Sequence, residues 1–140
     1  MKNDSVFRIE WNGLKELKNE FKTMTPRFKK IMLEELDKVA LECEGYAKDL
    51  AFVDTGELSK SINATQARLI NGEFVATVGT NLEYAMYVHE IQGQGPKTAL
   101  KPMIKGYQPG YKFLTNAVKL TESHYNRAMD NALKRLMEGR

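Results

Sequence analysis

One stretch of the chain, from Thr25 to Ala51, constrains the fold most because it predicts a helix as long as the whole domain. Thr25 is a favourable N-cap residue, and Pro26 is a favourable first helical residue. The helix would be about 39 Å long, against a radius of gyration of about 14 Å expected for a chain of this size. Its apolar side chains recur at spacings of three, four and one and form one stripe: Phe28, Met32, Leu36, Val39, Cys43, Tyr46, Ala47 and Leu50.

Two further apolar side chains of this helix, Ile31 and Leu41, lie off the stripe. Single apolar side chains are common on protein surfaces, whereas larger exposed apolar areas mark contacts with a partner. For Ile31 and Leu41 the sequence leaves both interpretations open.

The dipeptide Asn71-Gly72 between two β-prone runs predicts a β-hairpin. A two-residue type I′ turn needs positive φ at both central positions, which Asn and Gly adopt readily. The predicted register pairs Ile70 with Glu73, Leu69 with Phe74, Ala67 with Ala76 and Thr65 with Val78. It predicts a core face with Leu69, Ala67, Phe74, Ala76 and Val78, and an outer face with Arg68, Thr77, Gln66 and Val75.

The remaining elements are shorter or lie nearer the ends of the chain. Partial alternation predicts an edge strand within residues 1–13, and apolar spacing predicts helices over 14–21, 81–90 and 113–137. Residues 91–112, with their glycines and prolines, are expected to form a long flexible loop.

These elements predict the fold class α+β. A long N-terminal amphipathic helix and a C-terminal helix would pack on a small antiparallel β-sheet. A chain of 140 residues has the size of one domain, so we expect a single domain over 1–140, with 1–24 as an N-terminal arm and short helix.

Charge is distributed unevenly along a chain whose net charge is only +3. Residues 1–52 are neutral overall, residues 53–96 carry a net charge of −3, and residues 97–140 carry one of +6. A molecule with unlike charges on different faces can associate head to side with copies of itself. Ordinary solvated surface is the alternative interpretation.

No set of residues in the sequence predicts a catalytic or metal site. The single cysteine, Cys43, lies on the helical stripe and is expected to be a small buried side chain rather than a reactive thiol. His89 and His124 are too few and too far apart for a zinc site. His89 lies beside Glu90 near the end of a short helix, which favours a helix cap or an interface contact over catalysis. We expect no enzymatic activity and no cofactor.

No membrane-spanning segment and no secretion signal are expected either. The chain has no apolar run of the roughly 18 residues that a membrane span needs. The first four residues, Met-Lys-Asn-Asp, are followed by no apolar signal core.

The tripeptide Asp54-Thr55-Gly56 matches the active-site tripeptide of aspartic proteases, in which two aspartates share a proton. Its context differs, because it follows a long amphipathic helix instead of lying between β-strands. We therefore expect Asp54 or Thr55 to cap a short turn over 57–60.

The loop 91–112 carries lysines interleaved with tyrosines and is the best candidate for contact with a macromolecule. Lysine neutralises phosphate and tyrosine can stack on bases, so one interpretation is a small nucleic-acid-binding module that uses residues 97–112. The alternatives are a solvated flexible loop and a loop that docks on a neighbouring protein.

Four segments, taken in order, resemble the tail-completion, or head–tail joining, family of long-tailed bacteriophages and prophages. The segments are Val53-Asp54-Thr55-Gly56-Glu57-Leu58-Ser59-Lys60-Ser61-Ile62, Val78-Gly79-Thr80-Asn81, Glu83-Tyr84-Ala85-Met86-Tyr87-Val88-His89-Glu90 and Phe113-Leu114-Thr115-Asn116-Ala117. The chain departs from the family pattern at Lys112, where proline is usual, and in a longer Gly-rich loop that begins Ile91-Gln92-Gly93.

The resemblance implies a non-enzymatic virion protein that forms a ring, expected to be hexameric, at the head–tail interface. Its partners would be portal or connector proteins and tail-tube or tail-terminator proteins, assembled in the host bacterial cytoplasm. DNA would pass through the ring without specific binding. In this reading Asp54, Thr55, Gly56 and Ser61 fix a structural turn, and the interface candidates are Tyr84, Tyr87, His89, Lys97, Lys101, Lys105, Tyr107 and Tyr111.

Overall fold

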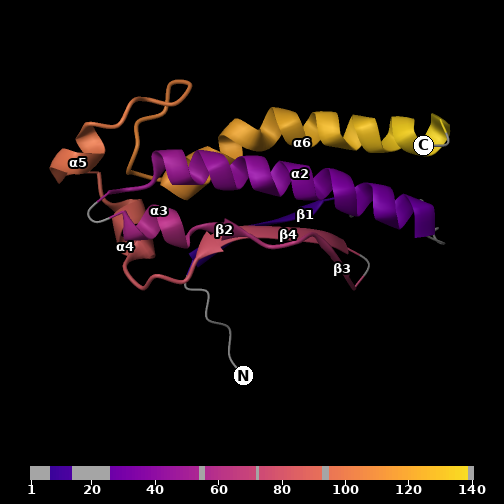
Figure 1. The fold of residues 1–140 in the computed structure, drawn as a ribbon, viewed down its shortest axis with the longest axis horizontal. Helices are drawn as coiled ribbons and strands as arrows, with labels where there is room; N and C mark the ends of the chain where they lie inside the picture. The colour runs from indigo at the N-terminus through magenta and orange to yellow at the C-terminus, as the bar shows by residue number, and fades with distance from the viewer. Residues whose placement is uncertain (1–6, 14–25, 54–55, 72, 93–94, 139–140) are drawn as a thin grey trace.

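The fold was obtained as a computed structural model that describes residues 7–13, 26–53, 56–71, 73–92 and 95–138 (Figure 1). The helix expected over 14–21 lies outside these residues. The described elements are β1 (Phe7–Gly13), α2 (Pro26–Leu50), α3 (Glu57–Ser61), β2 (Asn63–Ala64), β3 (Arg68–Ile70), β4 (Glu73–Thr80), α4 (Ala85–Glu90), α5 (Gly95–Ala99) and α6 (Phe113–Glu138). The predicted α+β class is confirmed: two long helices pack on a small antiparallel sheet.

Helix α2 is the central element of the core. It lies against β4 on one side and runs along α6 on another, and Figure 1 shows the two long helices side by side. Because α2 has two neighbours, its buried surface is wider than one stripe. Ile31, off the predicted stripe, is therefore fully buried, whereas Leu41 is 63% exposed.

Helices α2 and α6 run antiparallel and are joined by polar contacts as well as by apolar packing. Small buried side chains on α6, Ala117, Ala128 and Ala132, allow close approach to α2. Near the middle of the pair, His124 Nδ1 lies 2.8 Å from Glu42 Oε1.

Where the N-terminus of α2 lies beside the C-terminus of α6, two arginines connect the helices. Arg135 donates from Nη1 to Glu35 Oε2 (3.0 Å) and from Nη2 to Glu34 Oε1 (2.6 Å). Arg27 donates to the carbonyl oxygens of Arg135 (2.5 Å) and Leu136 (2.9 Å) and so caps the C-terminus of α6. The Glu35 side chain is only 4% exposed, so Arg135 compensates a carboxylate that is almost completely buried.

The sheet is built around β4. It pairs with β1 along one edge and with β2 and β3, one after the other, along the opposite edge. The edge strand expected within residues 1–13 is confirmed as β1.

The predicted hairpin register is correct next to the turn and wrong beyond it. Ile70 pairs with Glu73 and Leu69 with Phe74, as expected, but Val78 pairs with Ala64 instead of Thr65. The first run therefore contains one extra residue between its two paired segments, which is a β-bulge.

Two polar contacts hold this bulge. Asp37 of α2 accepts a hydrogen bond from the Ala67 N–H (2.6 Å), which takes that group out of the strand ladder. Thr65 donates its N–H to the Thr77 carbonyl (2.8 Å) and accepts the Thr77 N–H with its hydroxyl (3.2 Å). A local turn rule cannot predict a register that a distant helix side chain sets.

The predicted faces of β4 are only partly right. Phe74, Ala76 and Val78 are buried as expected, but Val75 and Thr77, expected on the outer face, are also buried (7% and 3% exposed). Side chains on both faces of β4 are thus buried along most of the strand, instead of alternating between buried and exposed.

Replacing Arg135 with methionine tests the contact between the helix ends. Arg135→Met removes the guanidinium that lies 3.0 Å from the buried Glu35 carboxylate and leaves the exposed Lys38, 3.5 Å away, beside it. We expect a loss of about 2 kcal/mol in the free energy of unfolding in urea, because a buried carboxylate that loses its nearest cation is costly. Glu35→Met in the same chain should recover most of the loss.

Arg127→Met is the control for this substitution. It removes a 3.5 Å contact with Ser123 and should change the free energy of unfolding by less than about 0.5 kcal/mol. Equal effects at Arg127 and Arg135 would contradict the assignment.

Candidate interaction surface

The segment 91–112, expected as a loop, contains helix α5 and a bridge between Ile104 and Tyr107. It lies at the end of the molecule where α2 ends (Figure 1). Thr98, fully buried, accepts the Val53 N–H with its hydroxyl (2.7 Å) and thereby fixes α5 to the chain that leaves α2.

The C-terminal carbonyls of α2 bind three separate segments of the chain. Lys101 Nζ donates to the carbonyls of Ala51 (2.8 Å) and Lys48 (3.3 Å), and the Gly110 N–H donates to the Leu50 carbonyl (2.7 Å). Ser59 Oγ also donates to Lys48 (3.3 Å). A helix C-terminus leaves carbonyls without helical partners, so Lys101 is a structural cap of α2. Burial lowers the pKa of Lys101, consistent with this enclosed position.

The other lysines of the segment differ in their contacts. Lys105 donates to the Tyr46 hydroxyl (2.8 Å), and its Nζ lies 5.3 Å from the centre of that ring. Lys112 binds Glu90 (2.7 Å). Lys97 and Lys105 are exposed, whereas Lys101 and Lys112 are half-buried. Of the four lysines, Lys97 and Lys105 are therefore the more accessible to solvent.

His89 is not a surface group, because it is only 2% exposed. Its Nδ1 lies 2.8 Å from Glu90 Oε2, and its Nε2 accepts a hydrogen bond from the Thr115 N–H (3.3 Å) in the first turn of α6. The ring packs edge-on against Phe113, with centroids 5.1 Å apart. The neutral ring protonated on Nδ1 satisfies both nitrogens. Burial lowers the pKa of His89, and the hydrogen bond to Glu90 opposes this effect.

The tyrosine candidates lie at different depths. Tyr87 is 68% exposed on α4, and Tyr111 is 37% exposed, with Lys112 Nζ lying 5.8 Å from its ring centre. Tyr84 and Tyr107 are half-buried and pack against the hydrophobic core. The fold thus separates the eight candidates into surface groups and groups that contribute to packing.

The turn predicted after α2 leads into helix α3 (Glu57–Ser61). The N-cap position of α3 is Gly56, with φ of 87° and no side-chain cap, whereas Asp54 and Thr55 lie outside the described residues. Glycine adopts this left-handed conformation without a steric penalty. Ser61 donates to the Leu58 carbonyl (2.7 Å) and lies 2.5 Å from the Thr80 hydroxyl, so it connects the end of α3 to the end of β4.

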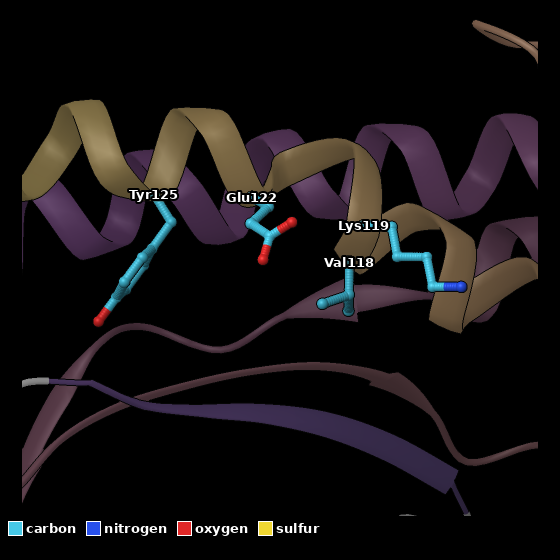
Figure 2. A pocket seen from close by; sticks show the side chains of 4 residues that line it. All are labelled: Val118, Lys119, Glu122 and Tyr125. Carbon is cyan, nitrogen blue, oxygen red and sulfur yellow. The ribbon is translucent and has the colours of Figure 1, made fainter.

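Cys43 is buried in the hydrophobic core. Burial raises the pKa of the Cys43 thiol to about 12, so it stays protonated near neutral pH. Within the described ranges no cluster of three potential metal ligands occurs, and none of the helices found there is long and apolar enough to cross a bilayer. A pocket beneath α6 is lined by Val118, Lys119, Glu122 and Tyr125, which point from the helix toward the sheet (Figure 2).

The sequence reasoning missed the polar side chains that position the sheet edge and α5. Asp37 and Glu44 of α2 accept hydrogen bonds from backbone N–H groups of Ala67 (2.6 Å) and Ala64 (2.9 Å), and Thr98 fixes α5. Asp37 and Glu44 lie seven residues apart and hence on one face of α2. That spacing was the available signal, but it does not say which backbone groups the carboxylates meet.

The described residues form two long helices on a small sheet, and the candidate interaction residues are divided between the surface and the packed interior of this frame. Residues 15–89, more than half of the chain, match the family model described as "Bacteriophage HK97-gp10, putative tail-component". The match covers α2 to α4 and stops before α5 and α6. No curated protein and no solved structure matches the chain. The chain belongs to the HK97 gp10-like family of phage tail components.

Lowering the pH tests the buried His89. The pKa of His89 is lower in the folded chain than the usual 6.5. The neutral ring therefore stabilises the folded chain fully above about pH 6.5, and this stabilisation is lost as the pH falls below that value. We expect the urea midpoint of the wild-type chain to fall between pH 7.5 and pH 5. His89→Gln should flatten this dependence in the same titration. An unchanged slope in His89→Gln would show that another group controls it.

Replacing Lys101 tests the cap on α2. Lys101→Met removes the donor to the Ala51 and Lys48 carbonyls, and we expect a loss of about 1–2 kcal/mol in the free energy of unfolding. Lys97→Met makes the same chemical change on the exposed surface of α5 and should cost less than about 0.5 kcal/mol. If both variants lose equal stability, the cap assignment is wrong.

Proposed function

We propose that this tail component joins the phage head to the tail as a ring of identical subunits at the head–tail interface. Membership of the tail-component family carries the proposal. The charge distribution and the exposed apolar side chains at the α5 end support it, since a ring subunit needs unlike surfaces that meet in neighbouring copies.

In this proposal the whole chain acts as one structural unit and catalyses no reaction. Its neighbours in the particle would be a portal or connector protein on the head side and a tail-tube or terminator protein on the tail side. DNA would pass through the ring without specific contacts, which fits a net charge of only +3 per subunit. Assembly would take place in the host cytoplasm.

Deleting the gene from a phage that encodes this chain tests the function. A joining protein predicts DNA-filled heads and complete free tails that remain separate, and a fall of several orders of magnitude in infectious particles. Supplying the wild-type chain from a plasmid should restore joined particles under the electron microscope. Absent or misshapen tails would place the protein in tail construction, and normal particles would exclude both roles.

Salt-dependent binding separates this proposal from a nucleic-acid-binding module. Lysine contacts with phosphate make affinity fall steeply with salt. We expect the chain to show only weak oligonucleotide binding, unchanged in Lys97→Ala/Lys105→Ala. Tight binding that this double variant abolishes would favour the module instead.

A further inference from the structure

His89 connects two helices that are separated in the chain by the segment 91–112. It belongs to α4, yet its Nε2 accepts the N–H of Thr115, the third residue of α6 (3.3 Å). The first N–H groups of a helix have no partner within the helix, and a side chain directly before the helix commonly accepts one of them. Here an imidazole from a different helix accepts it. His89 is therefore a cap of α6 that α4 supplies.

Two further contacts hold α4 to Lys112, the residue directly before α6. The Lys112 N–H donates to the His89 carbonyl (2.7 Å), and Lys112 Nζ donates to Glu90 Oε1 (2.7 Å). Lys112 has a φ of 56°, in the left-handed region that lysine seldom adopts. A residue stays in this region because its surroundings hold it there. Together, His89, Glu90, Lys112 and Thr115 form what we name the α4–α6 joint.

The surroundings of the His89 ring oppose a positive charge on it. The ring is almost completely buried and packs against the uncharged ring of Phe113. Its Nε2 faces the N-terminal end of α6, where the helix dipole disfavours a cation. Lys112 adds a second positive charge nearby. Glu90, whose Oε2 lies 2.8 Å from Nδ1, favours the charged ring, but this carboxylate is half-exposed and also binds Lys112.

Protonation of the ring removes the acceptor on which the cap depends. A neutral imidazole has one donor and one acceptor nitrogen, whereas an imidazolium donates from both. The Thr115 N–H would then face an N–H in place of a lone pair, and a donor that loses its acceptor inside a protein is costly. The Thr115 hydroxyl, 3.3 Å from Nε2, can accept from the protonated ring, but it cannot replace the acceptor that the backbone N–H has lost.

The contacts that hold the helical frame together lie outside this joint. Helix α6 is held to α2 by apolar packing and by Arg135, which binds Glu34 and Glu35. Thr98 and Lys101 hold α5 and the residues after it to the C-terminal end of α2. Loss of the joint therefore leaves these contacts in place.

We propose that protonation of His89 opens the α4–α6 joint and frees α4 from the first turn of α6, while α2 and α6 stay packed. Opening also releases Lys112 from its left-handed conformation, which favours the open state. The joint is closed near neutral pH and opens more often as the pH falls below about 6.5, where a freed histidine takes up a proton. This inference goes beyond the ring function proposed above and does not depend on it.

Amide hydrogen exchange, followed by NMR, tests this proposal because it reports opening residue by residue. We would compare the amides of Lys112 and Thr115, in the joint, with those of Ala40 and Cys43, in the middle of α2. The measurements are made at pH 7.5 and pH 5, over urea concentrations below the unfolding transition, and are corrected for the intrinsic exchange rate. Local opening exposes little surface and depends weakly on urea, whereas global unfolding depends on it strongly.

We expect the opening equilibrium of the two joint amides to rise about tenfold from pH 7.5 to pH 5, with little dependence on urea. The α2 amides should exchange only through urea-dependent unfolding. If the joint amides follow the same urea dependence as the α2 amides at pH 5, protonation favours only unfolding of the whole chain and the proposal is overturned. An opening equilibrium that does not change with pH overturns it as well.

The two histidines of the chain provide a matched pair of variants. His89→Gln keeps an acceptor for the Thr115 N–H but does not titrate, so the rise at the joint amides should disappear. His124→Gln removes the histidine that pairs with Glu42 (2.8 Å) between α2 and α6, and the rise should remain. A rise that persists in His89→Gln, or that His124→Gln abolishes, contradicts the assignment. The wild-type measurement decides the question even if His89→Gln does not fold.

Discussion

The antiparallel contact between α2 and α6 is the constraint on which the rest of the structure depends. A helix of 25 residues that buries ten of them needs a neighbour along its whole length, which a sheet with an eight-residue central strand does not supply. Helix α6 is that neighbour. Its small buried side chains pack along α2, and Arg135 of α6 and Arg27 of α2 make hydrogen bonds between the two helices near their ends. The apolar packing and the ion pair between buried Glu35 and Arg135 form in the same relative position of the two helices, and this position is therefore fixed.

Polar groups of α2 also position the bulged sheet edge and α5. Its carboxylates Asp37 and Glu44 bind backbone N–H groups of the bulged edge, and its last carbonyls bind Lys101, Ser59 and Gly110. Each contact satisfies a backbone group that would otherwise lack a partner within its own helix or strand. One helix therefore determines both the shape of the sheet edge and the position of α5.

Periodicity and turn chemistry were enough to predict the two long helices, the fold class and the hairpin next to Asn71, because those signals are local. The features that the sequence did not predict depend on contacts between residues far apart in the chain. Asp37 sets the register beyond the bulge, and Thr98 and Lys101 hold α5 in place. Ile31 is buried because α2 packs against both β4 and α6. Of the interface candidates, His89 and Lys101 were named for their chemical type, but the fold uses both internally.

The same helix also relates the bulged sheet edge to α5. Asp37, which binds the bulged edge, lies fourteen residues before Ala51, a distance of about 21 Å along the axis of a helix. The Ala51 carbonyl binds Lys101, which follows α5. Both parts of the molecule are therefore attached to one continuous helix rather than to a flexible connection. A heterologous contact between copies closes into a ring of defined size only when the rotation between its two surfaces is constant. In the proposed ring, weakening the Lys101 cap should therefore broaden the distribution of ring sizes before it unfolds the chain.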